Sequence, residues 1–411
     1  MTIRAAADPA PVVSLEDAAG AIAKARRATL ADRYAANSFT VEWCALPALE
    51  HIVAEWRALA AHAVEPNVFY EPAFLLAAAP VLGRDAGAML VWSGGASRHL
   101  LGLFPARIEQ RRYGLKLPIL VGLTHPYGPL GVPLVDRAAF EPVIAAFFAH
   151  LAAEATLPGL ALLPFLPEHG PFAAALDPLL RRGGMPIADF NRHQRALLAP
   201  GAERSRYVEH AIGRHRQKEL RRKWRRLAET GAVLITAATE PAAVGRALDD
   251  FLTVEAGGWK GKAGTAIADH EDVLRFIVTA IGDLAMEGKA AINRILVDGR
   301  AIAAAIVLHS GRFAWLWKIA YDEAFARYSP GVMLTVEVTR ELLDEASVTR
   351  VDSCATANHS MIDHLWRERL ALCDRLIAVR PHPPFALART LEGLRAMFVA
   401  QAKNIRARFG H

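Results

Sequence analysis

Residues 290–352 constrain the fold of this chain more than any other stretch. They contain three apolar runs of strand length, separated by short turn signals. The runs are residues 291–297, 301–309 and 313–320, and the turns are Asp298-Gly299 and Ser310-Gly311. An Asp-Gly pair between two such runs is a strong signal for a tight β-hairpin. The sequence therefore predicts an antiparallel meander of three strands.

A helix start follows the meander. Ser329-Pro330-Gly331 precedes residues 332–346, which have the apolar spacing of a helix. Pro330 forfeits no hydrogen bond there, because the first N–H groups of a helix have no partner within it. Those N–H groups and the positive end of the helix dipole form a site for an anion such as a pyrophosphate. The alternative is an ordinary helix cap. The predicted phosphate site comprises Arg327, Ser329, Pro330, Gly331, Val332 and Met333.

Length and composition limit the class of protein. A chain of 411 residues suggests two domains, and 53% hydrophobic residues supply a large core. No apolar run reaches the roughly 18–20 residues of a membrane-spanning helix, and the start has no secretory pattern. Cys44, Cys354 and Cys373 lack metal-like spacing, which fits buried thiols in a reducing cytoplasm.

The same order of elements occurs twice along the chain. In the first half we expect a hairpin over residues 88–109, a Pro/Gly-rich loop, a helix over 137–155 and a strand over 160–165. The later meander is likewise followed by a Ser-Pro-Gly loop, a helix and a strand ending at Asp352. We infer a structural repeat from this order alone, because the two sequences are not alike.

Four segments complete the expected organisation. They are a mobile tail (1–38), an N-terminal domain (39–200), a C-terminal domain that holds the donor site (201–385) and a basic C-terminal helix (386–411). A long basic helix (203–231) separates the halves, and the end of the second domain should contain a helix over 361–369 and a strand over 375–379.

Four motifs in the second half resemble the BioF2-like (CelD-type) acyltransferase family, within the GNAT superfamily and related to the Fem peptidyltransferases. They are the basic segment Arg216–Lys223, the Gly-rich segment Glu255–Gly264, Lys318–Glu323 together with Ser329–Gly331, and Asp352–Ala355 together with residues 359–369. The resemblance implies an α/β fold with mixed sheets, arranged as two tandem GNAT-like acyl-CoA N-acyltransferase folds. It also implies an acyl donor in one fold and an amine acceptor in the cleft between them.

Amide formation from a thioester needs a neutral amine, a proton acceptor and charge stabilisation at the developing oxyanion. Lys318 lies in an otherwise apolar strand, so it must point out of the core or be paired. By resemblance it would stabilise the oxyanion or a phosphate; otherwise it reaches the sheet edge. Glu255 ends a helix beside Trp259 and could be the base, or it could pair with Lys260 or Lys262.

Asp352 and His359 are further candidates. Strand ends in α/β sheets often face the ligand crevice, and His359 could carry a proton to the leaving thiolate or from the amine. Alternatively, Asp352 hydrogen-bonds a turn and His359 caps a helix. GNAT enzymes often have a tyrosine as general acid in the helix after this strand; residues 361–369 contain none, so Tyr321, His359 or water would replace it. We expect Cys354 to face the core.

The remaining site predictions concern the substrate. We place the acceptor near the Gly-rich loop and the end of the third strand, and near the rigid loop Thr124–Gly128, which could equally be an ordinary loop. The residues assigned to the substrate are His125, Tyr127, Trp259, Lys260, Tyr321 and Asp322.

The charge of the chain is concentrated in one segment. The net charge is +6, and residues 204–226 contain ten Lys or Arg against Glu209 and Glu219. Such a helix is often simply a solvated face; it could also contact a CoA phosphate, an anionic membrane or tRNA. Its apolar residues do not form one broad stripe, which disfavours a dedicated membrane helix.

The primary hypothesis is an acyl-CoA-dependent N-acyltransferase that acts by direct amine attack, with acyl-CoA as co-substrate and no metal. The acceptor would be an amine of a small molecule, an amino sugar or an amino lipid. One alternative keeps the fold and uses aminoacyl-tRNA or an acyl carrier protein, although a nucleic-acid partner is less expected. Another is a non-catalytic binding module in an envelope polysaccharide or lipid pathway. We expect a cytoplasmic protein, with peripheral contact to an anionic membrane through its basic helices as an option.

Overall fold

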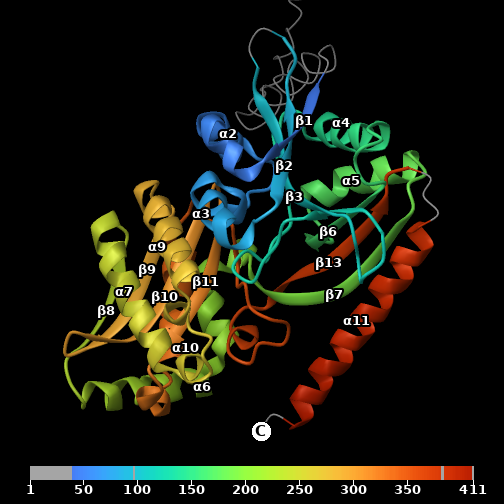
Figure 1. Cartoon of the computed structure of the whole chain (residues 1–411). Coiled ribbons are helices and arrows are strands. Elements are labelled where there is room, and N and C mark those ends of the chain that lie inside the picture. The colour runs from blue at the N-terminus through green and yellow to red at the C-terminus, as the bar shows by residue number, and fades with distance from the viewer. Residues whose placement is uncertain (1–38, 96–97, 381–383, 410–411) are drawn as a thin grey trace, which may run out of the picture.

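The computed structural model describes residues 39–95, 98–380 and 384–409 (Figure 1). The tail expected over residues 1–38 lies outside the described residues. The strands are β1 (Thr40–Ala45), β2 (Ala86–Trp92), β3 (Leu100–Glu109), β4 (Ile119–Gly122), β5 (Leu134–Val135), β6 (Leu160–Pro167), β7 (Ile187–Leu198), β8 (Val233–Ala238), β9 (Ala290–Val297), β10 (Arg300–Ser310), β11 (Phe313–Tyr321), β12 (Arg350–Asp352) and β13 (Glu368–Ala378).

Helices cover this sheet. The α-helices are α2 (Val53–His62), α3 (Pro72–Leu82), α4 (Phe140–Ala153), α5 (Pro171–Arg182), α6 (Tyr207–Ala228), α7 (Pro241–Gly257), α8 (Trp259–Lys262), α9 (Glu271–Met286), α10 (Pro330–Asp344) and α11 (Pro384–Phe409). The 3-10 segments are η1 (Leu46–Ile52), η2 (Val68–Tyr70), η3 (Gly201–Arg206), η4 (Ile267–Asp269), η5 (Glu323–Tyr328) and η6 (Ile362–His364). No helix in the described ranges is long and apolar enough to cross a bilayer.

One mixed sheet runs through both halves in the order β1-β2-β3-β4-β6-β13-β7-β12-β11-β10-β9-β8, and β5 pairs with β3. In each half an antiparallel meander is followed by a helix and then by a strand parallel to the last meander strand. These parallel pairs are β4 with β6 and β11 with β12. The structure therefore confirms the repeat and the tandem mixed α/β fold.

The two halves exchange their last strands. β13, from the end of the chain, pairs with β6 of the first half, while β7 of the first half pairs with β12 of the second. β7 and β13 also pair with each other along most of their lengths. The expected boundary near residue 200 stays a prediction, since hydrogen bonds of the sheet cross it in both directions.

The second-half meander forms as its turn residues predict. Asp298 and Gly299 both have positive φ (49° and 81°), as a tight two-residue hairpin turn requires. β10 is buried on both faces, and its side chains alternate between two cores. Ile306 packs with the helices α7 and α9, whereas Val307 packs with α6 and α10. The helices on the two faces thus hold the meander rigidly.

Two expected elements differ from the prediction. The helix expected over residues 361–369 is only the 3-10 turn η6, because β13 begins at Glu368 and the sheet pairing of this strand wins over helical spacing. The basic helix α6 is also shorter than expected and breaks at Gly213, where φ is 70° and ψ is 156°. Glycine permits this conformation without the steric cost of a side chain.

Candidate active site

A cavity opens where β11 and β12 diverge. The two strands pair in parallel only from Phe313 to Trp315 on β11, opposite residues 350–352. Beyond that point β11 continues to Tyr321, whereas β12 ends at Asp352 and the segment that follows it turns away. The cavity between them has a volume of about 520 Å³, which suits a cofactor-sized ligand.

Eight of the predicted site residues line this cavity. They are Trp259, Lys260, Lys318, Tyr321, Ser329, Gly331, Val332 and His359. They come from the Gly-rich loop, from β11, from the start of α10 and from the segment after β12. The structure thus brings together residues that are up to a hundred positions apart in the sequence.

The start of α10 forms one end of the cavity. Ser329 adopts a left-handed conformation (φ 57°, ψ 51°), and its hydroxyl accepts a hydrogen bond of 2.9 Å from Nζ of Lys223 on α6. Within the described chain, the N–H groups of Gly331 and Val332 have no acceptor. A Cβ on Gly331 would lie 3.0 Å from the Tyr321 ring. This end therefore offers free N–H groups, a nearby ammonium and no room for another side chain.

Lys318 projects from β11 next to a β-bulge. Ile306 of β10 pairs with Lys318 and the next residue pairs with Leu316, so Trp317 is the extra residue on β11. The ammonium of Lys318 lies 4.5 Å from the ring centre of Tyr127 and 5.3 Å from that of Trp317. Burial and the nearby charge of Lys260 lower the pKa of Lys318 to about 8. This lysine can therefore be charged or neutral near physiological pH.

Glu255 lies behind the cavity wall and is buried. Its carboxylate accepts a hydrogen bond of 2.5 Å from Lys260 and one of 3.0 Å from the N–H of Ile267. Glu255 therefore contacts the cavity lining through Lys260. This is the ion pair with Lys260 that the sequence indicated as the alternative to a catalytic base. Trp259 is 62% exposed and stands at the cavity mouth.

His359 and Cys354 line the wall opposite β11. Nδ1 of His359 accepts a hydrogen bond of 3.4 Å from the N–H of Met361, so in the neutral ring the proton is on Nε2. Cys354 is half-buried; it packs against the hydrophobic core, as expected, and it also lines the cavity. Burial and the charge of Asp352 raise the thiol pKa well above its ordinary value, so Cys354 is a thiol and not a nucleophilic thiolate.

Asp352 lies outside the lining of this cavity, and its carboxylate bonds to other groups of the protein. It is buried, and Oδ2 accepts a hydrogen bond of 2.5 Å from Arg195 on β7. Oδ1 accepts one of 3.0 Å from the N–H of Cys354, which shapes the turn after β12. The turn-forming alternative is therefore what the geometry shows.

Six other predicted residues also lie away from the cavity lining. Asp322 caps η5 and pairs with Arg300, and Arg327 stacks on the ring of Tyr328. The side chains of Pro330 and Met333 are buried in the core. His125 packs parallel to Phe74, and burial together with Arg107 lowers its pKa to about 4. Tyr127 contributes through its ring over Lys318 and through its carbonyl, which accepts a 2.8 Å bond from Trp317.

Sequence reasoning missed two residues of this region. Lys223 was seen only as one of many charges on a basic helix, and Arg195 was not singled out. Each acts through a contact with a residue more than a hundred positions away, and the sequence around them carries no signal for those contacts.

Comparison with known proteins gives a family match for the central part of the chain. Residues 214–359 match the family model of an acetyltransferase (GNAT) domain, and this range includes β9 to β12, α10 and most of the cavity. This part of the chain is therefore similar to a GNAT-type acetyltransferase domain. The protein is therefore an enzyme of the N-acyltransferase class, and the non-catalytic alternative is not favoured. No curated protein matched the chain.

Several solved structures are similar to this chain at low sequence identity, and of these FemX supports the fold. FemX is similar over 82% of this chain and 98% of its own, with a TM-score of 0.53 and 8% identity. L-PGS from Bacillus licheniformis has a TM-score of 0.42 and 13% identity, covering 71% of this chain and 84% of its own. A tandem GNAT protein from the clavulanic acid biosynthesis pathway has a TM-score of 0.40 and 13% identity, with 84% and 100% covered.

Proposed function

We propose that this protein transfers an acyl group from acyl-CoA to a primary amine. The observation that carries the proposal is the start of α10, where two free N–H groups and Lys223 meet at one end of the cavity. This arrangement suits the pyrophosphate of CoA, because helix N-termini and ammonium groups both stabilise bound phosphate. The cavity extends from there along β11 to Lys318, where the thioester would lie.

The unpaired edge of β11 is suited to bind a donor in an extended conformation. From Leu316 onward this strand has no partner on the β12 side, so its backbone groups face the cavity. A pantetheine arm has amide groups that can bond to such an edge as an added strand would. The arm would then direct the acyl carbonyl toward Lys318.

The reaction is a direct transfer. The amine attacks the thioester carbonyl, a C–N bond forms, and the C–S bond breaks with the electron pair leaving on sulfur. We assign stabilisation of the oxyanion to the ammonium of Lys318. His359, with its proton on Nε2, is placed to protonate the leaving thiolate. Lys260 would pass one of its own protons to Glu255 and take the proton of the attacking amine in its place, so Glu255 ends protonated and Lys260 remains an ammonium.

A second donor class has one observation in its favour. α6 carries eight Lys or Arg between Arg214 and Arg226, and its Lys223 reaches the phosphate end of the cavity. A basic surface of this kind suits a polyanionic donor such as aminoacyl-tRNA or an acyl carrier protein. Such a donor would bind far more weakly as salt is raised, whereas CoA contacts few charges and would respond less.

The location and partners of the protein are also proposals. We infer action in the cytoplasm, where acyl-CoA is found, on a small-molecule or lipid amine. The same basic helices could hold the protein peripherally on an anionic membrane surface. No group of three or more His, Cys, Asp or Glu in the described ranges is arranged to hold a metal ion.

Amine-dependent release of CoA thiol tests the proposal. We expect turnover with an acyl-CoA of some chain length, and we expect Lys318→Ala to lower kcat by about a hundredfold or more because the oxyanion loses its charge partner. The exposed Lys116→Ala is the matched control and should leave turnover unchanged. Equal turnover by Lys318→Ala and wild type would refute the role of Lys318. Turnover with aminoacyl-tRNA or carrier protein alone would replace CoA by the second donor class.

A further inference from the structure

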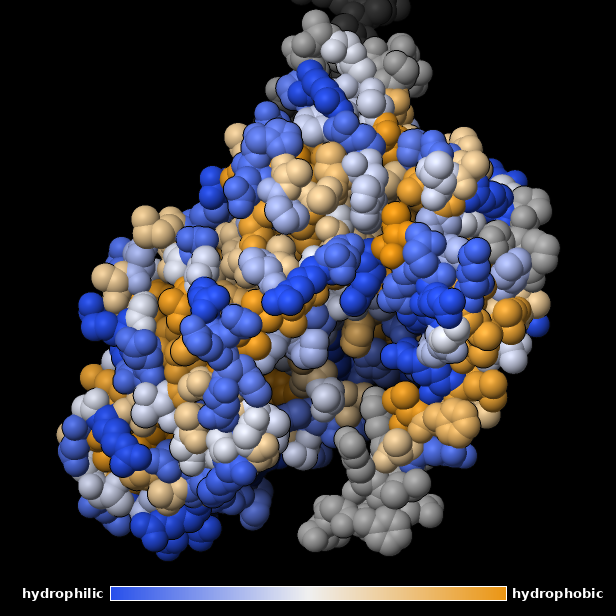
Figure 2. Space-filling model, in the orientation of Figure 1, coloured by the Kyte–Doolittle hydropathy of each residue, from blue (hydrophilic) through white to orange (hydrophobic). Residues whose placement is uncertain are grey.

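A second cavity lies on the other side of the segment that follows β12. It has a volume of about 530 Å³ and is enclosed by β7, β13, residues 354–357 and helix α11. Figure 2 shows the surface hollowed between α11 and the side of the molecule that carries β9–β11. Cys354 and Ala355 line both cavities, so a single thin segment separates the second cavity from the donor cavity.

Arg195 supplies a buried guanidinium to the second cavity. Its side chain is only 2% exposed, and its Nη2 donates to Asp352 at 2.5 Å. Its Nε is buried and has no hydrogen-bond partner in the structure. An unpaired donor of a buried charged group is costly unless a ligand satisfies it. Arg195 is thus a cation with spare donor capacity at the wall of an otherwise open cavity.

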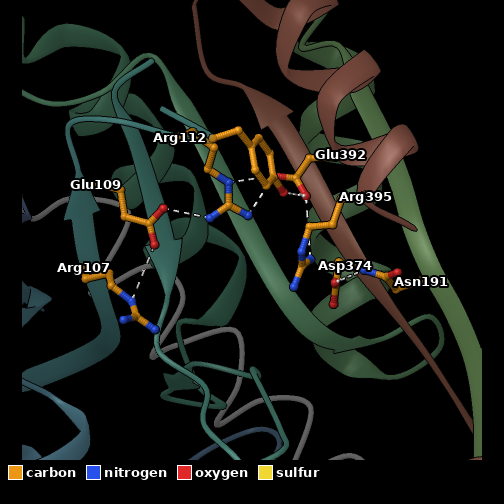
Figure 3. A network of polar contacts seen from close by, with 8 residues as sticks. Arg107, Glu109, Arg112, Asn191, Asp374, Glu392 and Arg395 are labelled. Atoms are coloured by element: carbon orange, nitrogen blue, oxygen red, sulfur yellow. Dashed lines mark hydrogen bonds and ion pairs between the residues drawn. The ribbon is translucent and has the colours of Figure 1, made fainter. Parts of the chain in front are cut away.

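Arg395 approaches the same cavity from α11. Its side chain is 46% exposed, and its guanidinium lies 3.9 Å from Glu392, its partner one turn earlier. Glu392 is itself buried and accepts hydrogen bonds from Arg112 and Tyr113, which fixes α11 to the loop after β3 (Figure 3). Because Glu392 is used by those two groups, Arg395 remains largely available to a ligand.

Most of the acidic and basic groups around the cavity already have partners. The carboxylate of Asp374 accepts hydrogen bonds from the N–H of Phe165 and from Asn191. Arg192 is paired with Glu168 and Asp189. Arg195 is likewise paired with Asp352, so its unpartnered Nε donor and the loosely paired Arg395 are what the cavity offers to an anion.

We propose that the second cavity binds an anionic group, carboxylate or phosphate, of the amine acceptor. The inference rests on the proposed N-acyltransferase function and names its acceptor class: an amine that also carries an anion. Arg195 and Arg395 hold the anion, and the amine lies toward Cys354 and Ala355, which also line the donor cavity that contains Lys318. A neutral amine of the same length lacks the group that Arg195 and Arg395 recognise.

Matched amines test this proposal by calorimetric binding at low salt without any donor. The carboxylate pair is 4-aminobutanoate and butylamine; the phosphate pair is phosphoethanolamine and ethanolamine. We expect the anionic member of at least one pair to bind about tenfold or more tightly than its neutral counterpart. The pair that shows the difference identifies the anion as carboxylate or phosphate.

Two variants assign the binding to the arginines. Arg395→Gln should weaken binding of the anionic amine about tenfold. Arg389 is an exposed arginine on the same helix, and Arg389→Gln should leave that affinity unchanged. Arg195→Ala risks unfolding because it leaves Asp352 buried and unpaired. Arg195→Lys retains the charge but loses the planar guanidinium with its paired N–H donors, so it should also weaken binding of the anionic amine.

The proposal is overturned if both pairs show equal affinities, if no anionic member binds at millimolar concentration, or if Arg395→Gln binds like Arg389→Gln. Because binding is measured without a donor, it is independent of acyl-CoA turnover. Selective binding of the anionic amine without use of acyl-CoA would refute the proposed donor and leave the anion site standing.

Discussion

Lys318 is the residue on which the proposed chemistry depends most. Its ammonium lies over the ring of Tyr127 at the end of a largely apolar strand, and burial lowers its pKa to about 8. The face of an aromatic ring favours the charged form, while burial favours the neutral form. The result is a group that changes charge close to the pH at which the enzyme would work.

The pH dependence of kcat/KM follows from this pKa. Below about pH 8 Lys318 is charged and can stabilise the oxyanion; above it the charge is lost, so kcat/KM should fall on the alkaline side. Lys318→Arg keeps its charge at all accessible pH values, so its alkaline fall should disappear, even where its maximal rate is lower. An unchanged alkaline limb in Lys318→Arg would assign that limb to another group.

Lys318 should also reduce stability at neutral pH. Its pKa is lower in the folded state than the ordinary value of about 10.4, so between about pH 8 and 10 the unfolded chain binds more protons and stability rises with pH. At pH 7 Lys318→Met should therefore raise the free energy of unfolding by about 1–2 kcal/mol, allowing for partial exposure. Urea denaturation measures this, and a loss of stability in Lys318→Met would contradict it.

At the scale of elements, the meander and the start of α10 could be predicted because their signals are local. Asp298-Gly299 specifies a turn, and Ser329-Pro330-Gly331 specifies a helix start. The helix expected over residues 361–369 was wrong because this segment enters β13, whose partners β6 and β7 are distant in the sequence. The contact of Lys223 with Ser329 could not be predicted either, because these residues are also distant in the sequence.

The packing of Gly331 gives a prediction about the phosphate site. Valine at this position would place a Cβ 3.0 Å from Tyr321 and crowd the free N–H groups, so we expect CoA affinity to fall at least tenfold. Gly282→Val is the control, since Gly282 of α9 has no neighbour within 4 Å of a Cβ. Calorimetric titration of CoA with both variants measures the effect. Unchanged affinity in Gly331→Val would place the phosphates elsewhere.

At the scale of the whole molecule, the order of elements revealed a repeat but not the exchange of β7 and β13. That exchange depends on pairing between strands about 180 residues apart, which no local pattern encodes. It has a functional consequence, because β7 carries Arg195 to the turn after β12 and β13 contributes Asp374 to the second cavity. The second cavity is lined by residues of both halves, whereas the donor cavity is lined by residues 259–362 alone.

The proposed donor site is tested most directly by thermal unfolding with CoA, acetyl-CoA and longer acyl-CoAs at low and moderate salt. At about a hundred times its dissociation constant, a bound donor should stabilise the folded protein by roughly 2.7 kcal/mol. We expect such a shift with at least one acyl-CoA in the wild type and a smaller shift in Gly331→Val at the same concentration. No shift with any acyl-CoA at either salt concentration would contradict acyl-CoA as the donor.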